Sequence, residues 1–100
     1  MTLGRWLPRL KTILRGWVRR RRSAEKIIHL AVDSLACVRK EKGVTFEELG
    51  GLTGLHPTAL SRIERHERRP TGETLYLIAM SLDVSLAAIL HRAEKQAGLA

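Results

Sequence analysis

The strongest constraint on the fold is a glycine and a proline, Gly54 and Pro57, that separate two short segments with helical spacing of apolar residues. Glycine readily takes the left-handed conformation that ends a helix, and proline suits the first position of the next helix. Only Leu55 and His56 lie between them. The sequence therefore predicts two short helices joined by a tight turn.

Apolar residues recur at helical spacing on both sides of this turn. Residues that favour helices are common, whereas aromatic residues make up only 4% of the chain. A length of 100 residues allows one small domain with a thin core. We therefore expect an all-α domain over residues 24–97. Its predicted buried positions are Ile27, Ile28, Ala31, Leu35, Val38, Leu49, Leu52, Ala59, Leu60, Ile63, Leu75, Ile78, Ala79, Leu82, Leu86, Ile89 and Leu90.

Capping signals mark the ends of the helices in this domain. The first helix, over about 24–42, is followed by Gly43, which can end it in a left-handed conformation. Thr45 and Glu48 form a T-x-x-E capping box for the second helix. Thr71 and Ser85 can cap the last two helices, which continue through residue 82 and toward residue 98.

The segment from Met1 to Arg22 forms a basic arm. It contains eight Arg or Lys residues and no Asp or Glu, while the rest of the chain contains ten of each sign, so the formal net charge of +8 lies in this segment. The spacing of its apolar residues predicts an amphipathic helix from about Pro8 to Arg22. Such an arm usually binds a polyanion, either nucleic acid or an anionic membrane. Its apolar stripe is Leu3, Trp6, Leu7, Leu10, Ile13, Leu14, Trp17 and Val18.

The sequence leaves three roles open for this arm. The stripe can pack against the domain or a second subunit. The Arg and Lys side chains can bind DNA that flanks the binding site. Alternatively, residues 1–22 can bind an anionic membrane or a protein partner. Because an exposed stripe of this size promotes aggregation, burial of some kind is favoured. Alternatively, residues 19–22 form an extended linker held open by their like charges.

Other classes of function are poorly supported. Cys37 is the single cysteine, so no disulfide can form within the chain, and no Cys/His spacing resembles a zinc site. The four histidines show no catalytic pairing, and we expect neither an enzyme nor a cofactor. Arg and Lys interrupt the apolar residues too often for an export signal or a membrane span. We expect a cytoplasmic, nucleoid-associated protein.

The segment from Pro57 to Arg65 has the two faces of a DNA-recognition helix. Ala59, Leu60 and Ile63 form an apolar back. A DNA major groove about 12 Å wide admits one α-helix, which needs such a back to hold it on the domain and a polar front to meet base edges. The polar front carries Thr58, Ser61, Arg62 and Arg65.

The chain from about Leu35 to Leu90 resembles the Cro/repressor-type, or XRE, helix-turn-helix family, to which lambda repressor belongs. The similar elements are T-x-E-E-L at 45–49, S-R-I-E-R at 61–65, R-x-P-x-x-E-T-L at 68–75 and V-S-L at 84–86. The resemblance implies a five-helix lambda repressor-like domain, preceded here by the basic amphipathic helix of residues 1–23. It also implies a sequence-specific regulator of transcription.

The resemblance implies that four residues contact bases, with Arg62 able to bind guanine in a bidentate manner that is worth roughly 1–3 kcal/mol of discrimination. It also implies a structural ion pair between Arg39 and Glu64, which would join the first helix of the domain to the recognition helix. The implied base contacts are His56, Thr58, Ala59 and Arg62. The implied phosphate contacts are Thr45, Phe46, Ser61, Arg65, Arg68 and Arg69.

Three positions depart from the family pattern. Phe46 and Pro57 stand where many relatives place polar residues, often glutamine, that contact DNA. Base reading then depends mainly on Thr58 and Arg62. His66 replaces a glycine that follows I-E-R in the family, so it has to accept a left-handed conformation.

The sequence therefore favours a repressor or controller protein that binds an operator in double-stranded DNA as a homodimer. One small domain buries too little surface for high specificity, and two recognition helices about 34 Å apart would supply it. The alternatives are an antitoxin-like module, whose N-terminal helix binds a protein partner, and a membrane-associated regulator.

Overall fold

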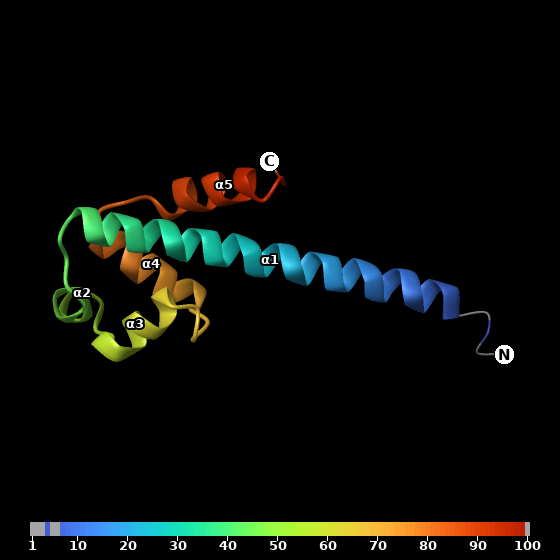
Figure 1. The fold of residues 1–100 in the computed structure, drawn as a ribbon, viewed down its shortest axis with the longest axis horizontal. Helices are drawn as coiled ribbons and strands as arrows, with labels where there is room; N and C mark the ends of the chain where they lie inside the picture. Colours follow the sequence, from blue (N-terminus) through green and yellow to red (C-terminus); the bar gives the residue numbers. More distant parts are fainter. Residues whose placement is uncertain (1–3, 5–6, 100) are drawn as a thin grey trace.

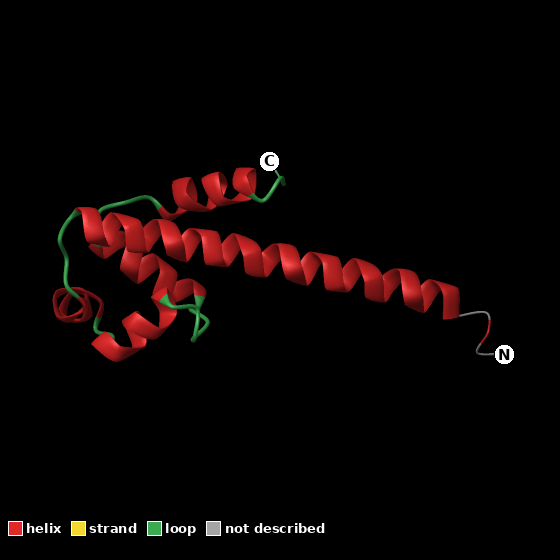
Figure 2. Cartoon of the chain, viewed as in Figure 1, coloured by secondary structure: helices red, strands yellow, loops and turns green. Residues whose placement is uncertain are grey.

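The computed structural model describes Gly4 and residues 7–99, and this part of the chain contains five α-helices and no strand (Figures 1 and 2). Their bounds are α1 Leu7–Glu41, α2 Phe46–Thr53, α3 Pro57–Glu64, α4 Gly72–Ser81 and α5 Leu86–Gln96. The prediction of an all-α fold is confirmed. Leu3 and Trp6, assigned to the apolar stripe, lie outside the described residues.

Helix α1 is the long axis of the molecule, which measures 61 × 27 × 18 Å. Figure 1 shows α2, α3 and α4 on one side of its C-terminal half and α5 on the other, so this half is the centre of the domain. The N-terminal half projects beyond all four shorter helices. The arm and the domain therefore share one element.

The prediction of two separate helices over 8–22 and 24–42 was wrong, because α1 runs unbroken from Leu7 to Glu41. Ser23 and Ala24, at the predicted junction, are both compatible with a helix interior. The four consecutive arginines before them also remain helical. Like charges alone thus do not open residues 19–22 into a linker.

The helix ends follow the predicted capping signals. The hydroxyls of Thr45, Thr71 and Ser85 each accept a hydrogen bond from the backbone N–H three residues later, at 3.1, 3.1 and 3.2 Å. Gly43 and Gly54 have φ angles of 67° and 76°, the left-handed conformation expected after α1 and α2. The tight turn between α2 and α3 is therefore encoded locally.

The core lies between α1 and the four shorter helices, and most of its members were predicted. Leu52 is an exception, because its side chain is 62% exposed. Thr53 takes the inward position instead, and its buried hydroxyl donates to the Leu49 carbonyl at 2.7 Å and accepts from the Leu55 amide at 3.2 Å. The buried apolar residues are Ala31, Val32, Leu35, Leu49, Ala59, Leu60, Ile63, Leu75, Ile78, Ala79, Leu82, Leu86, Ile89 and Ala93.

Gly50 sets the closeness of α2 and α3, a role that the spacing of apolar residues does not reveal. A Cβ atom at this position would lie 2.8 Å from the backbone oxygen of Leu55 and 3.3 Å from Cγ of Pro57. Only a residue without a side chain lets the turn pack so tightly against α2. At the neighbouring Gly51 a Cβ atom would meet nothing within 4 Å.

The apolar stripe of the arm is exposed in the protomer. Its described members are between 39% and 61% exposed, so the stripe does not pack against the domain of its own chain. The prediction that the stripe packs against the domain of its own chain is therefore wrong. The described stripe residues are Leu7, Leu10, Ile13, Leu14, Trp17 and Val18.

Within the described residues, α1 to α5 include no single helix that is long and apolar enough to cross a membrane. The pair α4 and α5 reaches that length and composition together, with a bend of 114° between them.

The close approach at Gly50 predicts opposite effects for two adjacent alanine substitutions. Gly50→Ala should destabilise the fold by about 1–3 kcal/mol, because the new methyl group collides with backbone. Gly51→Ala should stabilise it by up to about 1 kcal/mol, because alanine is the better helix former and has open space there. Urea unfolding followed by circular dichroism measures both. Equal stability of the two variants would contradict the packing described here.

Candidate nucleic-acid interface

Helix α3 divides into the two predicted faces. Ala59, Leu60 and Ile63 are buried against the rest of the domain, whereas Thr58 and Arg62 are exposed. The exposed face is therefore polar and cationic, and it belongs to a helix whose back is anchored in the core. This is the geometry that a helix needs to enter a major groove.

Ala59 does not reach this exposed face. Its side chain is 9% exposed and belongs to the apolar back of α3. The base contact that the resemblance implies for Ala59 stays a prediction, and little of its methyl group is accessible to make that contact.

His56 is the N-cap of α3, a role that was not predicted for it. Its Nδ1 atom accepts a hydrogen bond from the Thr58 amide at 3.1 Å. The neutral ring consequently carries its proton on Nε2, which makes Nε2 a donor at the exposed start of α3. Capping and the implied base contact are compatible, because they use different nitrogen atoms.

Arg39 joins α1 to both helices of the turn. Its guanidinium binds the Glu64 carboxylate in a bidentate manner, with Nε–Oε1 and Nη2–Oε2 distances of 2.5 and 3.0 Å. Its Nη1 atom donates to the Val44 carbonyl at 2.7 Å, and its Cζ atom lies 4.2 Å from the ring centroid of Phe46. The Arg39 and Glu64 side chains are only 11% and 17% exposed. The ion pair implied by the resemblance is thus part of a larger contact that fixes α3 and the start of α2.

Phe46 is held by this contact, so its ring is half-buried rather than directed to solvent. Any phosphate contact at Phe46 would come from its backbone N–H at the start of α2. Thr45 is exposed beside it, and its hydroxyl also lies 3.3 Å from Glu48 Oε1. The acidic residues Glu47 and Glu48 occupy the same first turn and oppose an approaching phosphate.

The arginines at the end of α3 and in the following loop are exposed. Arg65 pairs with Glu67 at 3.1 Å and Arg69 with Glu25 at 3.0 Å, and such exposed pairs exchange partners at little cost. Arg62 and Arg68 form no ion pair with the part of the chain that the structure describes. The loop therefore offers guanidinium groups that a phosphate backbone can recruit.

His66 has a φ angle of 60°, the left-handed conformation expected for a residue that replaces glycine. Its Nε2 atom lies 2.8 Å from Asp33 Oδ1, and its ring centroid lies 4.3 Å from that of His29. Both partners belong to α1. The loop after α3 is thus fastened to α1 through contacts that the spacing of these residues in the sequence did not suggest.

The family assignment follows from a match to the helix-turn-helix family model over residues 38–89, which is just over half of the chain. The match contains α2, the turn and α3. The chain belongs to the XRE-type helix-turn-helix family. This makes it a DNA-binding regulator of transcription and not an enzyme.

Two curated proteins are similar to this XRE-type chain. One is an uncharacterized HTH-type transcriptional regulator, y4dJ, of Sinorhizobium fredii (strain NBRC 101917 / NGR234), with 43% identity over 56% of this chain and 73% of that protein. The other is the control protein C.SmaI of Serratia marcescens, with 30% identity over 66% of this chain and 79% of that protein. No solved structure matches the chain.

The XRE-family match begins at residue 38, so the projecting half of α1 lies outside it. Arg39, Glu64 and Arg62 lie inside it. The recognition helix and its anchor therefore belong to the shared domain, and the arm is a feature of this chain that the family model does not describe.

The Arg39 contact predicts that Glu64→Gln destabilises the fold more than the loss of an exposed ion pair does. Loss of the carboxylate leaves a mostly buried guanidinium with weaker partners, which should cost roughly 1.5–3 kcal/mol of stability. Glu67→Gln is the matched control, because it removes the same charge from an exposed pair and should cost less than about 1 kcal/mol. Chemical denaturation measures both, and similar losses for the two would show that the Arg39 contact contributes little.

The cap at His56 predicts which substitutions α3 tolerates. His56→Asn should retain stability, because asparagine is a good N-cap, whereas His56→Ala should lose about 1 kcal/mol. Thermal unfolding followed by circular dichroism distinguishes the two variants. An alanine variant as stable as the asparagine variant would mean that the Nδ1 contact does not stabilise α3.

Proposed function

We propose that the protein binds specific sequences in double-stranded DNA, with α3 in the major groove. The observation that carries this proposal is the exposed, cationic face of α3 on a helix that is anchored by its buried back and by the ion pair of Arg39 with Glu64. An anchored helix presents its side chains at fixed positions, which base recognition requires. The domain over residues 24–97 carries this activity, and residues 1–23 form the arm.

The interface makes two kinds of contact, one with base edges and one with phosphates. Arg62, Thr58 and the Nε2 atom of His56 read base edges, because they lie on the exposed face and at the exposed start of α3. Phosphates are bound by residues that flank this face and serve any sequence. These are Thr45, the backbone N–H of Phe46, Ser61, Arg65, Arg68 and Arg69.

The protein acts as a homodimer on a two-fold related operator, as a repressor or controller. A relative of this chain is named as a control protein, which supports a controller. The inner face of α5 is used within the protomer, because Leu86 and Ile89 are buried where α5 packs on α1. Dimerisation through α5 would have to use its outer surface. A regulator of this kind works in the cytoplasm, on the nucleoid.

Arg62→Ala should relax the preference for one base pair in each half-site and cost roughly 1–3 kcal/mol of discrimination there, because the bidentate contact to guanine is lost. The measurement is selection of bound sequences from a random duplex library, followed by titration of single-base variants of the selected site.

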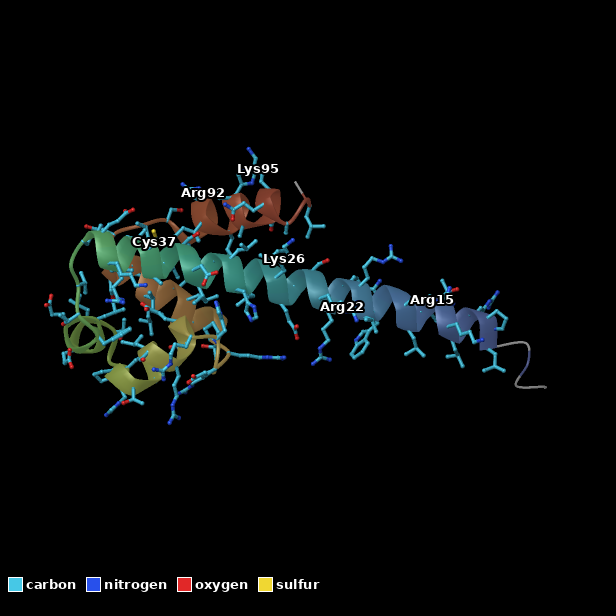
Figure 3. All side chains as sticks on the ribbon, viewed as in Figure 1. Arg15, Arg22, Lys26, Cys37, Arg92 and Lys95 are labelled. Carbon is cyan, nitrogen blue, oxygen red and sulfur yellow. The ribbon has the colours of Figure 1, made fainter. Side chains whose placement is uncertain are left out.

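Arg92→Ala is the control for this experiment. Figure 3 shows Arg92 on the outer side of α5, across α1 from α3, so the variant loses the same charge far from the proposed interface. It should retain the wild-type preference at every position. An Arg62 variant that loses affinity equally for selected and random DNA would refute a base-reading role for Arg62.

A further inference from the structure

The arm carries a row of Arg and Lys residues on the same side of α1 that, further along the helix, lies next to α3. An α-helix has about 3.6 residues per turn, so positions separated by five full turns lie on the same side of it. Lys11, Arg15 and Arg22 precede His29, Asp33 and Lys40, respectively, by five turns, so each lies on the same side of α1 as its counterpart. We call Lys11, Arg15 and Arg22 the basic row.

The counterparts of the basic row border the interface. His29 and Asp33 contact His66 in the loop after α3, as described above. Asp33 and Lys40 also line a shallow groove whose other wall contains Ser61 and Arg65 of α3 and its end. The side of α1 that carries the basic row is therefore the side next to Ser61 and Arg65, two of the proposed phosphate contacts.

The arm is stiff and long enough to follow DNA away from the recognition helix. No break interrupts α1 between Lys11 and Asp33, and at a rise of about 1.5 Å per residue this segment spans about 33 Å. This length is close to one turn of DNA, about 34 Å. Figure 3 shows Arg15 and Arg22 on the part of α1 that projects beyond the domain.

We propose that the basic row binds phosphates of the DNA that flanks the sequence read by α3. This inference rests on the proposed function, since it needs α3 in the groove to place the arm. The row contains only Arg and Lys, and residues 1–22 contain no Asp or Glu that would repel the phosphates. The arm adds affinity and salt dependence without reading sequence, because phosphates are the same at every base pair.

An anionic membrane is a poorer fit, because the apolar stripe faces the side that carries the domain. Ile13 and Trp17 of the stripe precede the buried Ala31 and Leu35 by five helical turns, so the two pairs lie on the same side of α1. A flat lipid surface laid along the stripe would collide with the helices that pack against those core residues. Figure 1 shows these helices beside the C-terminal half of α1, next to the place where the arm joins the domain.

A second copy of the arm is also a poor partner for the stripe. Arg9 and Arg20 lie along one edge of the stripe, and Lys11 and Arg22 lie along the other. Two stripes packed together would bring these like charges close to one another, and residues 1–22 offer no acid to compensate.

The test compares two double variants with equal loss of charge. Arg15→Gln/Arg22→Gln removes two members of the basic row. Arg9→Gln/Arg20→Gln removes two charges from another side of the same helix. Circular dichroism checks that both remain as helical as the wild type, which the similar helix propensities of Arg and Gln favour. Binding is titrated against salt on a short duplex, which contains only a site selected by the wild-type protein, and on a long duplex with one additional turn on each side.

On the long duplex, Arg15→Gln/Arg22→Gln should make the negative slope of log affinity against log salt shallower, by about 1.8 for each arm that binds. The affinity should fall on the order of tenfold. On the short duplex it should bind like the wild type. Arg9→Gln/Arg20→Gln should stay close to the wild type on both. Equal losses for the two variants on the long duplex, or no loss for either, would overturn the proposal.

Two further outcomes separate this proposal from its neighbours. If the wild-type protein selects no site from a random library, the proposed function fails, whatever the arm does. If a site is selected but Arg15→Gln/Arg22→Gln changes only sedimentation with phosphatidylglycerol vesicles and not DNA binding, the arm is a membrane element and the proposal is wrong.

Discussion

The arrangement of the interface depends on the contact of Arg39 with Glu64. The Arg39 side chain contacts the Glu64 carboxylate at the end of α3, the carbonyl of Val44 and the ring of Phe46. It therefore positions both helices of the turn relative to α1. The buried back of α3 supplies most of the adhesion, but apolar contacts have little directionality. A bidentate pair has a defined geometry. We infer that hydrophobic burial holds α3 on the domain and that Arg39 fixes its orientation.

Features governed by neighbouring residues could be predicted from the sequence. The caps at Thr45, Thr71 and Ser85 and the left-handed Gly43 and Gly54 depend on contacts within a few residues, and the structure contains all of them. The apolar periodicity located nearly all of the core for the same reason. Its failure at Leu52 came from the shortness of α2, where Thr53 can satisfy its hydroxyl internally and take the buried position.

Features that depend on distant parts of the chain could not be predicted in this way. Gly50 is needed only because the backbone of Leu55 folds back against it, and His66 meets Asp33 and His29 only once α3 is packed. The pairing of Arg39 with Glu64 came from the family resemblance, not from spacing. The continuity of α1 was missed because capping signals mark where helices begin and end, and no signal marked either state between residues 22 and 24.

We expect α3 to occupy the major groove, once in each half of a two-fold site. The most direct test is protection of guanine N7 atoms from methylation on a selected duplex, because N7 is accessible only from the major groove. Two groups of protected guanines should appear, with their centres about one helical turn apart and their pattern related by two-fold symmetry. Binding that leaves every guanine N7 reactive, or protects a single group, would contradict this expectation.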